Sequence, residues 1–128
     1  MILDTSAIVA ILLQEPQQES LLDKLEPASL RIVSAPIMVE AAVVLTHHLK
    51  EDTERTLSRF LRTFSVEVVP FVDVHWIEAA KAVLRFGKGH HPAGLNLGDC
   101  MTYATAKVAG FPLLCLGNDF SKTDLELA

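Results

Sequence analysis

The chain has 128 residues and a mass of 14.0 kDa, enough for one core that hides about two-thirds of the unfolded surface. Half of its residues are apolar, yet charged residues interrupt every long apolar stretch, and there are only two cysteines. This composition excludes a membrane-spanning helix, a disordered chain and a disulfide scaffold. The net charge of −5 argues against nucleic-acid binding by bulk positive charge alone, but it is compatible with an acidic metal site. We therefore expect a single globular domain over residues 1–128.

Short apolar strands and helices are predicted to alternate through the first half of the chain. The apolar start at Met1 to Leu3 is followed by Asp4-Thr5-Ser6, a cluster typical of the N-terminus of a helix. Apolar periodicity and the positions of prolines predict the elements that follow. These are helices at 7–13 and 17–25, a strand at 31–33, and helices at 36–49 and 52–64.

The second half continues the same pattern. Residues 66–71 are rich in β-branched side chains and predict a strand. A helix is expected over 73–86, with Ile77, Ala80, Val83 and Leu84 facing the core. The remaining elements are a loop at 87–98, a helix from Leu97 to about Ala109 that Asn96 caps and Gly110 ends, and a buried strand at 112–116.

This alternation predicts an α/β fold with a parallel central sheet and helices on both faces. Ligands of such sheets bind at the carboxyl ends of the strands, which directs attention to the residues found there. The first residues lack the basic region of a signal peptide, and Cys100 and Cys115 lie in apolar surroundings typical of reduced thiols. A cytoplasmic protein without membrane contact is therefore expected.

Four carboxylates are predicted at or near this edge. Asp4 follows the first strand, Glu40 lies early in the helix after the second, Asp99 is the third residue of the 97–109 helix, and Asp119 follows the last strand. Taken singly, each has an ordinary explanation as a helix cap, a first-turn acid or a turn residue. Taken together, four converging carboxylates would repel one another by several kcal/mol unless a cation neutralised them.

The chemistry of these four groups favours a hard divalent cation. Carboxylate oxygens without a matching set of His and Cys ligands are typical of Mg²⁺ or Mn²⁺ sites rather than zinc sites. Such a centre suits the hydrolysis of phosphodiester bonds by water that the metal activates.

Three segments in order along the chain carry a family resemblance. The opening Ile2 to Ala7 resembles that of PIN-domain nucleases, the segment Arg85 to Cys100 is similar to the loop-and-helix signature of VapC-type toxins, and Leu113 to Asp124 resembles their final strand and tail. The resemblance implies a PIN-like fold and an Mg²⁺- or Mn²⁺-dependent endoribonuclease. It also implies the toxin component of a type II (VapBC-type) toxin–antitoxin system.

The resemblance also assigns roles to the acids. Asp4, Glu40 and Asp99 match the family's metal-site positions. Asp4 and Asp99 would hold the principal cation, with Glu40 as a ligand or as the group that orients the attacking water. The chain departs from the general PIN pattern at Gly117, where an Asp is usual. Asp119 is the expected fourth acid, completing a second metal position or acting through water, and Asp124 is an alternative fourth acid.

Neighbouring polar residues have two interpretations each. Thr5 and Ser6 could donate hydrogen bonds around Asp4 or simply cap the first helix. Basic and potentially basic side chains precede Asp99 and could hold an RNA backbone beside the metal or complement the dipole of a helix end. They are Arg85, Lys88, His90 and His91.

The family implies three partners: an RNA substrate, a VapB-type antitoxin that offers Arg or Lys to the acidic groove, and a second copy of the chain in a homodimer. Two other functions compete with the ribonuclease. A domain whose Asp4 accepts a phosphoryl group is disfavoured, because Asp4-Thr5-Ser6 lacks a second Asp two residues on. A non-catalytic RNA-binding or regulatory PIN-like domain with a degenerate metal site stays open because of Gly117.

Overall fold

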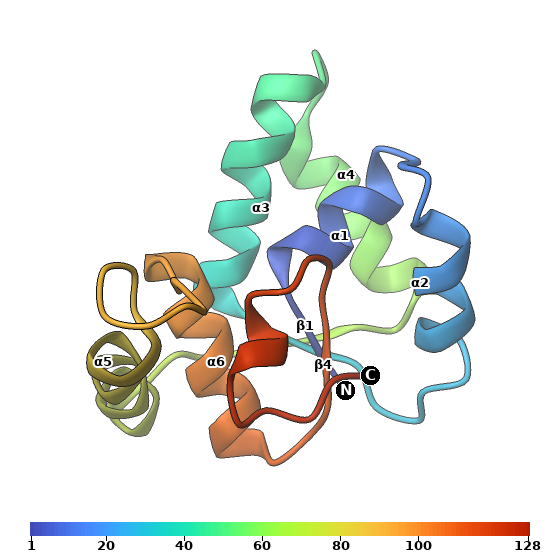
Figure 1. Cartoon of the computed structure of the whole chain (residues 1–128). Helices are drawn as coiled ribbons and strands as arrows, with labels where there is room; N and C mark the ends of the chain where they lie inside the picture. Colours follow the sequence, from blue (N-terminus) through green and yellow to red (C-terminus); the bar gives the residue numbers. More distant parts are fainter.

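The computed structural model describes residues 1–128 and is built on a four-stranded parallel sheet with the strand order β3-β2-β1-β4 (Figure 1). The predicted α/β class, a parallel sheet flanked by helices, is confirmed. The strands are β1 (Ile2–Leu3), β2 (Ile32–Ser34), β3 (Glu67–Val69) and β4 (Leu113–Leu114). The helices are α1 (Thr5–Leu12), α2 (Gln18–Leu25), α3 (Ala35–His48), α4 (Thr53–Thr63), α5 (Asp73–Phe86), α6 (Leu97–Ala109) and the 3₁₀ turn η1 (Phe120–Lys122).

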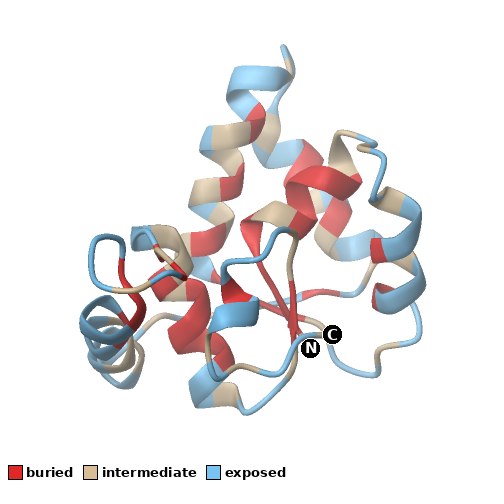
Figure 2. Cartoon of the chain, viewed as in Figure 1, coloured by how far each residue is buried: buried red, intermediate tan, exposed pale blue.

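The sheet separates two apolar cores. Successive residues of a strand point to opposite faces, so Leu3 and Val33 join a core with α1 to α4, whereas Ile2 and Ile32 join a core with α5 and α6. All four of these side chains are buried, and β1, β2 and β4 lie at the buried centre of the molecule in Figure 2, whereas the edge strand β3 is largely exposed. β1 and β2 therefore each contribute side chains to both cores.

Local signals account for the ends of several helices. The Asn96 side chain accepts a hydrogen bond from the Asp99 amide and begins α6, and Gly110 ends the helix in a left-handed conformation with φ of 68°. The Asp52 side chain begins α4 by accepting from the Arg55 amide. No helix of the structure combines the length and apolar character that crossing a bilayer requires.

The predicted inward face of α5 is wrong. Ile77, Ala80, Val83 and Leu84 are exposed, Leu84 with 76% of its surface, and the helix instead buries Ala82 and Phe86. Apolar residues occur all around this helix, so their spacing does not define a single buried face. The predicted strand over 66–71 is also shorter in the structure, because only Glu67–Val69 pairs, as an edge strand next to β2.

The C-terminal tail is fastened to α5 and α6 through Asp124. The carboxylate accepts hydrogen bonds from Tyr103 Oη (2.7 Å), Lys107 Nζ (2.9 Å) and Arg85 Nη1 (3.2 Å). Burial raises the pKa of Asp124, but the hydrogen bonds from Lys107 and Tyr103 outweigh this effect and bring the pKa to about 2. Leu127 then forms a bridge to Leu113 in the sheet.

We predict that Asp124→Asn lowers the free energy of unfolding by about 1 kcal/mol at pH 7, because partly exposed hydrogen bonds to an ionised group contribute about that much. The pKa of Asp124 is lower in the folded protein than in the unfolded chain, so its stabilising effect is complete above about pH 4 and disappears as the pH falls toward 2. Urea denaturation of both proteins from pH 7 to pH 2 measures this. A difference that stays constant down to pH 2 would contradict the prediction.

Candidate metal centre

Asp4 is the most firmly held of the predicted acids. It follows β1 directly and caps α1, with Oδ2 accepting from Ser6 N (3.0 Å) and Ser6 Oγ (2.5 Å). Its Oδ1 accepts a 2.7 Å bond from the fully buried Thr102 hydroxyl of α6. The carboxylate is therefore buried with both oxygens hydrogen-bonded, and its position is fixed by elements on both faces of the sheet.

The two residues after Asp4 differ in their contacts. Ser6 Oγ donates to Asp4 and accepts from the Leu116 amide (3.0 Å), which ties the segment after β4 to the start of α1. Thr5 Oγ1 is buried and has no hydrogen-bond partner of good geometry. It lies close enough to Glu40 to lower the pKa of that carboxyl. A buried hydroxyl without a partner of good geometry is unusual, so the Thr5 oxygen is available to a polar group at this edge.

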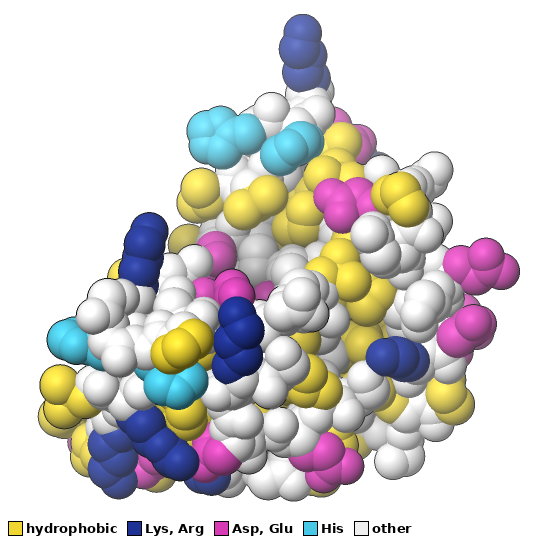
Figure 3. All heavy atoms as spheres, viewed as in Figure 1, with side chains coloured by type: hydrophobic (Ala, Val, Ile, Leu, Met, Phe, Trp, Pro, Cys, Tyr) yellow, Lys and Arg dark blue, Asp and Glu magenta, His cyan; other side chains and the backbone are white.

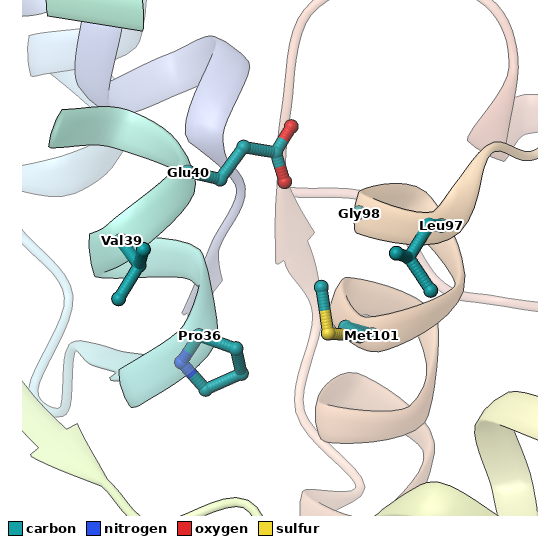
Figure 4. Close-up of a pocket in the computed structure, with 6 residues that line it drawn as sticks. All are labelled: Pro36, Val39, Glu40, Leu97, Gly98 and Met101. Carbon is teal, nitrogen blue, oxygen red and sulfur yellow. The ribbon is translucent and has the colours of Figure 1, made fainter. Parts of the chain in front are cut away.

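Glu40 projects from α3 toward the first turn of α6. Figure 4 shows its carboxylate reaching across to Gly98. The pKa of Glu40 is raised, first by burial and then by the negative charges of Asp4 and Asp99. No protein group donates a well-formed hydrogen bond to this carboxylate, so hydrogen bonds restrain Glu40 less than Asp4 and Asp99.

Asp99 takes part in the capping of α6. Its Oδ2 accepts from the Asn96 amide (3.0 Å), while Asn96 Oδ1 accepts from the Asp99 amide (2.9 Å). Burial raises the pKa of Asp99, the Asn96 hydrogen bond lowers it, and the charges of Asp4 and Asp119 raise it further, with a net increase. The capping role expected of a first-turn acid is thus present together with proximity to two other acids.

The two candidates for the fourth acid lie in different places. Asp119 is exposed at the start of η1 and close enough to raise the pKa of Asp99. Asp124 is held by Arg85, Lys107 and Tyr103 in the tail. Gly117, where the family usually has an acid, has a φ of 84°, a conformation that favours glycine over residues with a Cβ. The backbone at this position therefore suits glycine, and an added Cβ would meet open space.

None of the four acids forms an ion pair with a Lys, Arg or His side chain. The ion pairs of the structure join Lys81 to Glu78 and both Arg85 and Lys107 to Asp124, so none includes Asp4, Glu40, Asp99 or Asp119. Acidic side chains collect in a hollow near the centre of the face in Figure 3. In this arrangement, no group of three or more His, Cys, Asp or Glu side chains is close enough to hold a metal ion together.

The basic residues before Asp99 have mixed surroundings. Arg85 pairs with Asp124 and lies over the Phe86 ring, 4.6 Å from its centroid. His91 Nδ1 accepts from the Ala93 amide (3.0 Å), so this side chain organises the loop. Lys88 and His90 are exposed and form no side-chain hydrogen bond or ion pair. Only these two are free to contact a ligand.

Two residues with direct contacts to the acids were missed in the sequence. Thr102 donates to Asp4, and Gly98 lies against Glu40. Thr102 follows Asp99 by three residues and therefore shares its side of α6, a spacing that could have identified it. Nothing in the sequence signals the contact of Gly98, because it depends on how α3 packs beside α6.

The fold agrees with the comparisons to known proteins. The PIN-domain family matches residues 1–126, so the chain belongs to that family. The Mycobacterium tuberculosis protein "Ribonuclease VapC36" is 42% identical over 127 residues, which cover 98% of this chain and 91% of the relative. "Ribonuclease VapC" of Mycolicibacterium smegmatis is 44% identical over 126 residues, covering 98% and 97%. The resemblance to VapC-type proteins is thereby confirmed.

Solved structures show the same fold at low sequence identity. Mycobacterium tuberculosis VapC20, described as a "Sarcin-Ricin loop cleaving toxin", aligns with a TM-score of 0.79 and 14% identity, covering 99% of this chain and 97% of that one. A "Toxin-antitoxin complex from Klebsiella pneumoniae" aligns with a TM-score of 0.73 and 12% identity, covering 99% and 95%.

We predict that Thr102→Val lowers the free energy of unfolding by about 1–3 kcal/mol, because the buried Asp4 loses a donor and valine supplies none. Thr102→Ser keeps the hydroxyl and is the matched control. Urea denaturation in the presence of EDTA measures both, and the serine variant should retain more stability than the valine variant. Equal losses would show that packing, rather than the hydrogen bond, is what Thr102 contributes.

We also predict that Glu40→Gln raises the free energy of unfolding at pH 7 in EDTA. The pKa of Glu40 is higher in the folded protein than in the unfolded chain, so the ionised form destabilises the fold, and this cost is relieved as the pH falls through the raised pKa. The gain should disappear near pH 4. Glu67→Gln on the exposed edge strand is the control and should show no such dependence. A glutamine variant no more stable than wild type at pH 7 would be the contrary result.

Proposed function

We propose that this protein is an Mg²⁺- or Mn²⁺-dependent endoribonuclease and the toxin component of a type II (VapBC-type) toxin–antitoxin system. The observation that carries the proposal is the electrostatic proximity of Asp4, Glu40, Asp99 and Asp119 at one edge of the sheet, where none of them forms an ion pair with a cationic side chain. Curated relatives at about 40% identity over nearly the whole chain bear the name ribonuclease, which supports RNA as the substrate.

The residues at this edge fit a hard divalent cation. Carboxylates are the ligands that Mg²⁺ and Mn²⁺ prefer, and the unpartnered Thr5 hydroxyl beside Glu40 adds a further oxygen. The neighbouring Cys115 suits a soft metal poorly, because burial and the charge of Asp4 raise its pKa to about 11 and keep it protonated. Since the carboxylates are not close enough as they lie, holding a cation requires at least one of them to change rotamer.

We assign the chain's own groups to separate tasks. Asp4, fixed by Ser6 and Thr102, would provide the immobile ligand, and Asp99 would provide the second from the start of α6. Glu40 would act as a further ligand, or would orient the attacking water by accepting a hydrogen bond at its carboxylate. A divalent cation would supply Lewis-acid activation of water and neutralise negative charge that develops on the phosphate.

The expected partners have support of different kinds. The exposed Lys88 and His90 could contact an RNA backbone. A solved neighbour is described as a toxin–antitoxin complex, which supports an antitoxin partner, and an Arg or Lys of that partner could replace the cation among the carboxylates. The expected homodimer is supported by large apolar side chains that α3 and α6 expose near the acids, among them Val39 and Leu97.

A non-catalytic RNA-binding domain is the second candidate, because Gly117 lacks the usual acid. The two functions differ in one measurable property. An endoribonuclease releases new RNA ends in Mg²⁺ or Mn²⁺ and stops in EDTA, whereas a binding domain retains RNA without cleaving it.

We predict that Asp4→Asn and Asp99→Asn each reduce Mg²⁺-dependent RNA cleavage by at least about 100-fold, because each removes a charge from the cation site. Purified protein incubated with total bacterial RNA, followed by sequencing of the 5′ ends, measures this and identifies the cleaved sequence. Glu67→Gln, an exposed acid on β3, should cleave as the wild type does.

The same assay separates the candidates for the fourth acid. Asp119→Asn should slow cleavage more than Asp124→Asn, because Asp119 acts on Asp99 electrostatically while Asp124 is engaged in the tail.

Full activity in the Asp4→Asn protein would overturn the metal assignment.

A further inference from the structure

Gly98 is in close contact with the carboxylate of Glu40. A Cβ built on Gly98 would lie 2.6 Å from Glu40 Cδ and 2.7 Å from Glu40 Oε1, and still closer to Oε2. Ordinary contacts of a Cβ begin near 3.4 Å. The Glu40 carboxylate therefore occupies the space that any other residue at position 98 would fill, as the approach of Glu40 toward Gly98 in Figure 4 illustrates.

The backbone gives no other reason for glycine at this position. Gly98 lies in the first turn of α6, and it is not among the glycines with positive φ. A glycine within a helix is less favourable than alanine by about 1 kcal/mol. The missing side chain thus has a cost in helix stability, and the visible gain is the approach of Glu40 to the residue that precedes Asp99.

The surroundings allow Glu40 to move if this space is filled. A cavity of about 400 Å³ lies between α3 and α6 beside the carboxylate. It is lined by Pro36, Val39, Glu40, Leu97, Gly98 and Met101. Because the crowded atoms belong to the end of a flexible side chain, an alanine at position 98 can be accommodated by turning Glu40 away, without disturbing α6.

We propose that Gly98 is a positioning residue that seats the Glu40 carboxylate against the first turn of α6, beside Asp99, and thereby sets the affinity of the acidic edge for a divalent cation. This inference rests on the proposed function. Gly98 and Asp99 therefore act together. Asp99 supplies its own carboxylate, and Gly98, which has no side chain, leaves space for the Glu40 carboxylate from α3.

The test measures the affinity of the purified full chain for Mn²⁺ in the absence of RNA. Electron paramagnetic resonance and calorimetry report the binding. Gly98→Ala should weaken Mn²⁺ binding about tenfold or more, the usual effect of disturbing a residue that orients a metal ligand. Glu40→Asp retains the charge but withdraws the carboxylate from Gly98, so it should also weaken binding. In the Glu40→Asp background, Gly98→Ala should have little further effect, because its target has already moved.

Stability measurements distinguish positioning from a general defect. In EDTA, Gly98→Ala should unfold at the wild-type temperature or slightly higher, since alanine favours the helix. Val108→Ala, at the exposed far end of α6, is the matched control and should bind Mn²⁺ as the wild type does.

The possible outcomes separate the two proposals. If the wild type binds Mn²⁺ and Gly98→Ala binds it equally well, the role of Gly98 is refuted while the proposed function stands. A tenfold loss that persists in the Glu40→Asp background would show that Gly98 does not act through Glu40. Absence of Mn²⁺ binding by the wild type would overturn the proposed function, and with it this role of Gly98.

Discussion

Repulsion among carboxylates at one edge of the sheet is the constraint on which the rest of the structure depends. Asp4 and Asp99 both raise the pKa of Glu40, and Asp119 acts on Asp99 in the same direction. The fold tolerates this arrangement because separate contacts hold the acids: two residues donate to Asp4, and the capping of α6 restrains Asp99. Hydrogen bonds to an ionised carboxylate offset part of the repulsion.

Much of the fold could be predicted because its signals are local. The cap Asn96 and the terminator Gly110 define α6 in the sequence as they do in the structure. The face of α5 could not be predicted, because the choice between Leu84 and Phe86 for burial depends on which side meets α6. The edge position of β3 likewise follows from strand order, which the residues 66–71 alone do not contain.

The candidate site likewise has a part that could be predicted from the sequence and a part that could not. The positions of Asp4 and Asp99 next to predicted element ends are visible in the sequence, and topology brings such ends to one edge. The contacts that orient them are not visible. Thr102 reaches Asp4 across 98 residues of sequence, and Gly98 meets Glu40 because two helices from different parts of the chain pack side by side. Long-range packing determines these pairs, and a single sequence does not specify it.

The division of β1 between two cores has a consequence for how the molecule comes apart. Ile2 belongs to the core under α5 and α6 and Leu3 to the core under α1 to α4, so neither half can open without stripping contacts from the same two-residue strand. We therefore expect cooperative unfolding rather than one half melting ahead of the other. Asp4 follows this shared strand, while Glu40 and Asp99 arrive from opposite halves. Unfolding of either half would separate Glu40 or Asp99 from Asp4. We therefore expect that no half-folded form of the chain keeps these three acids together.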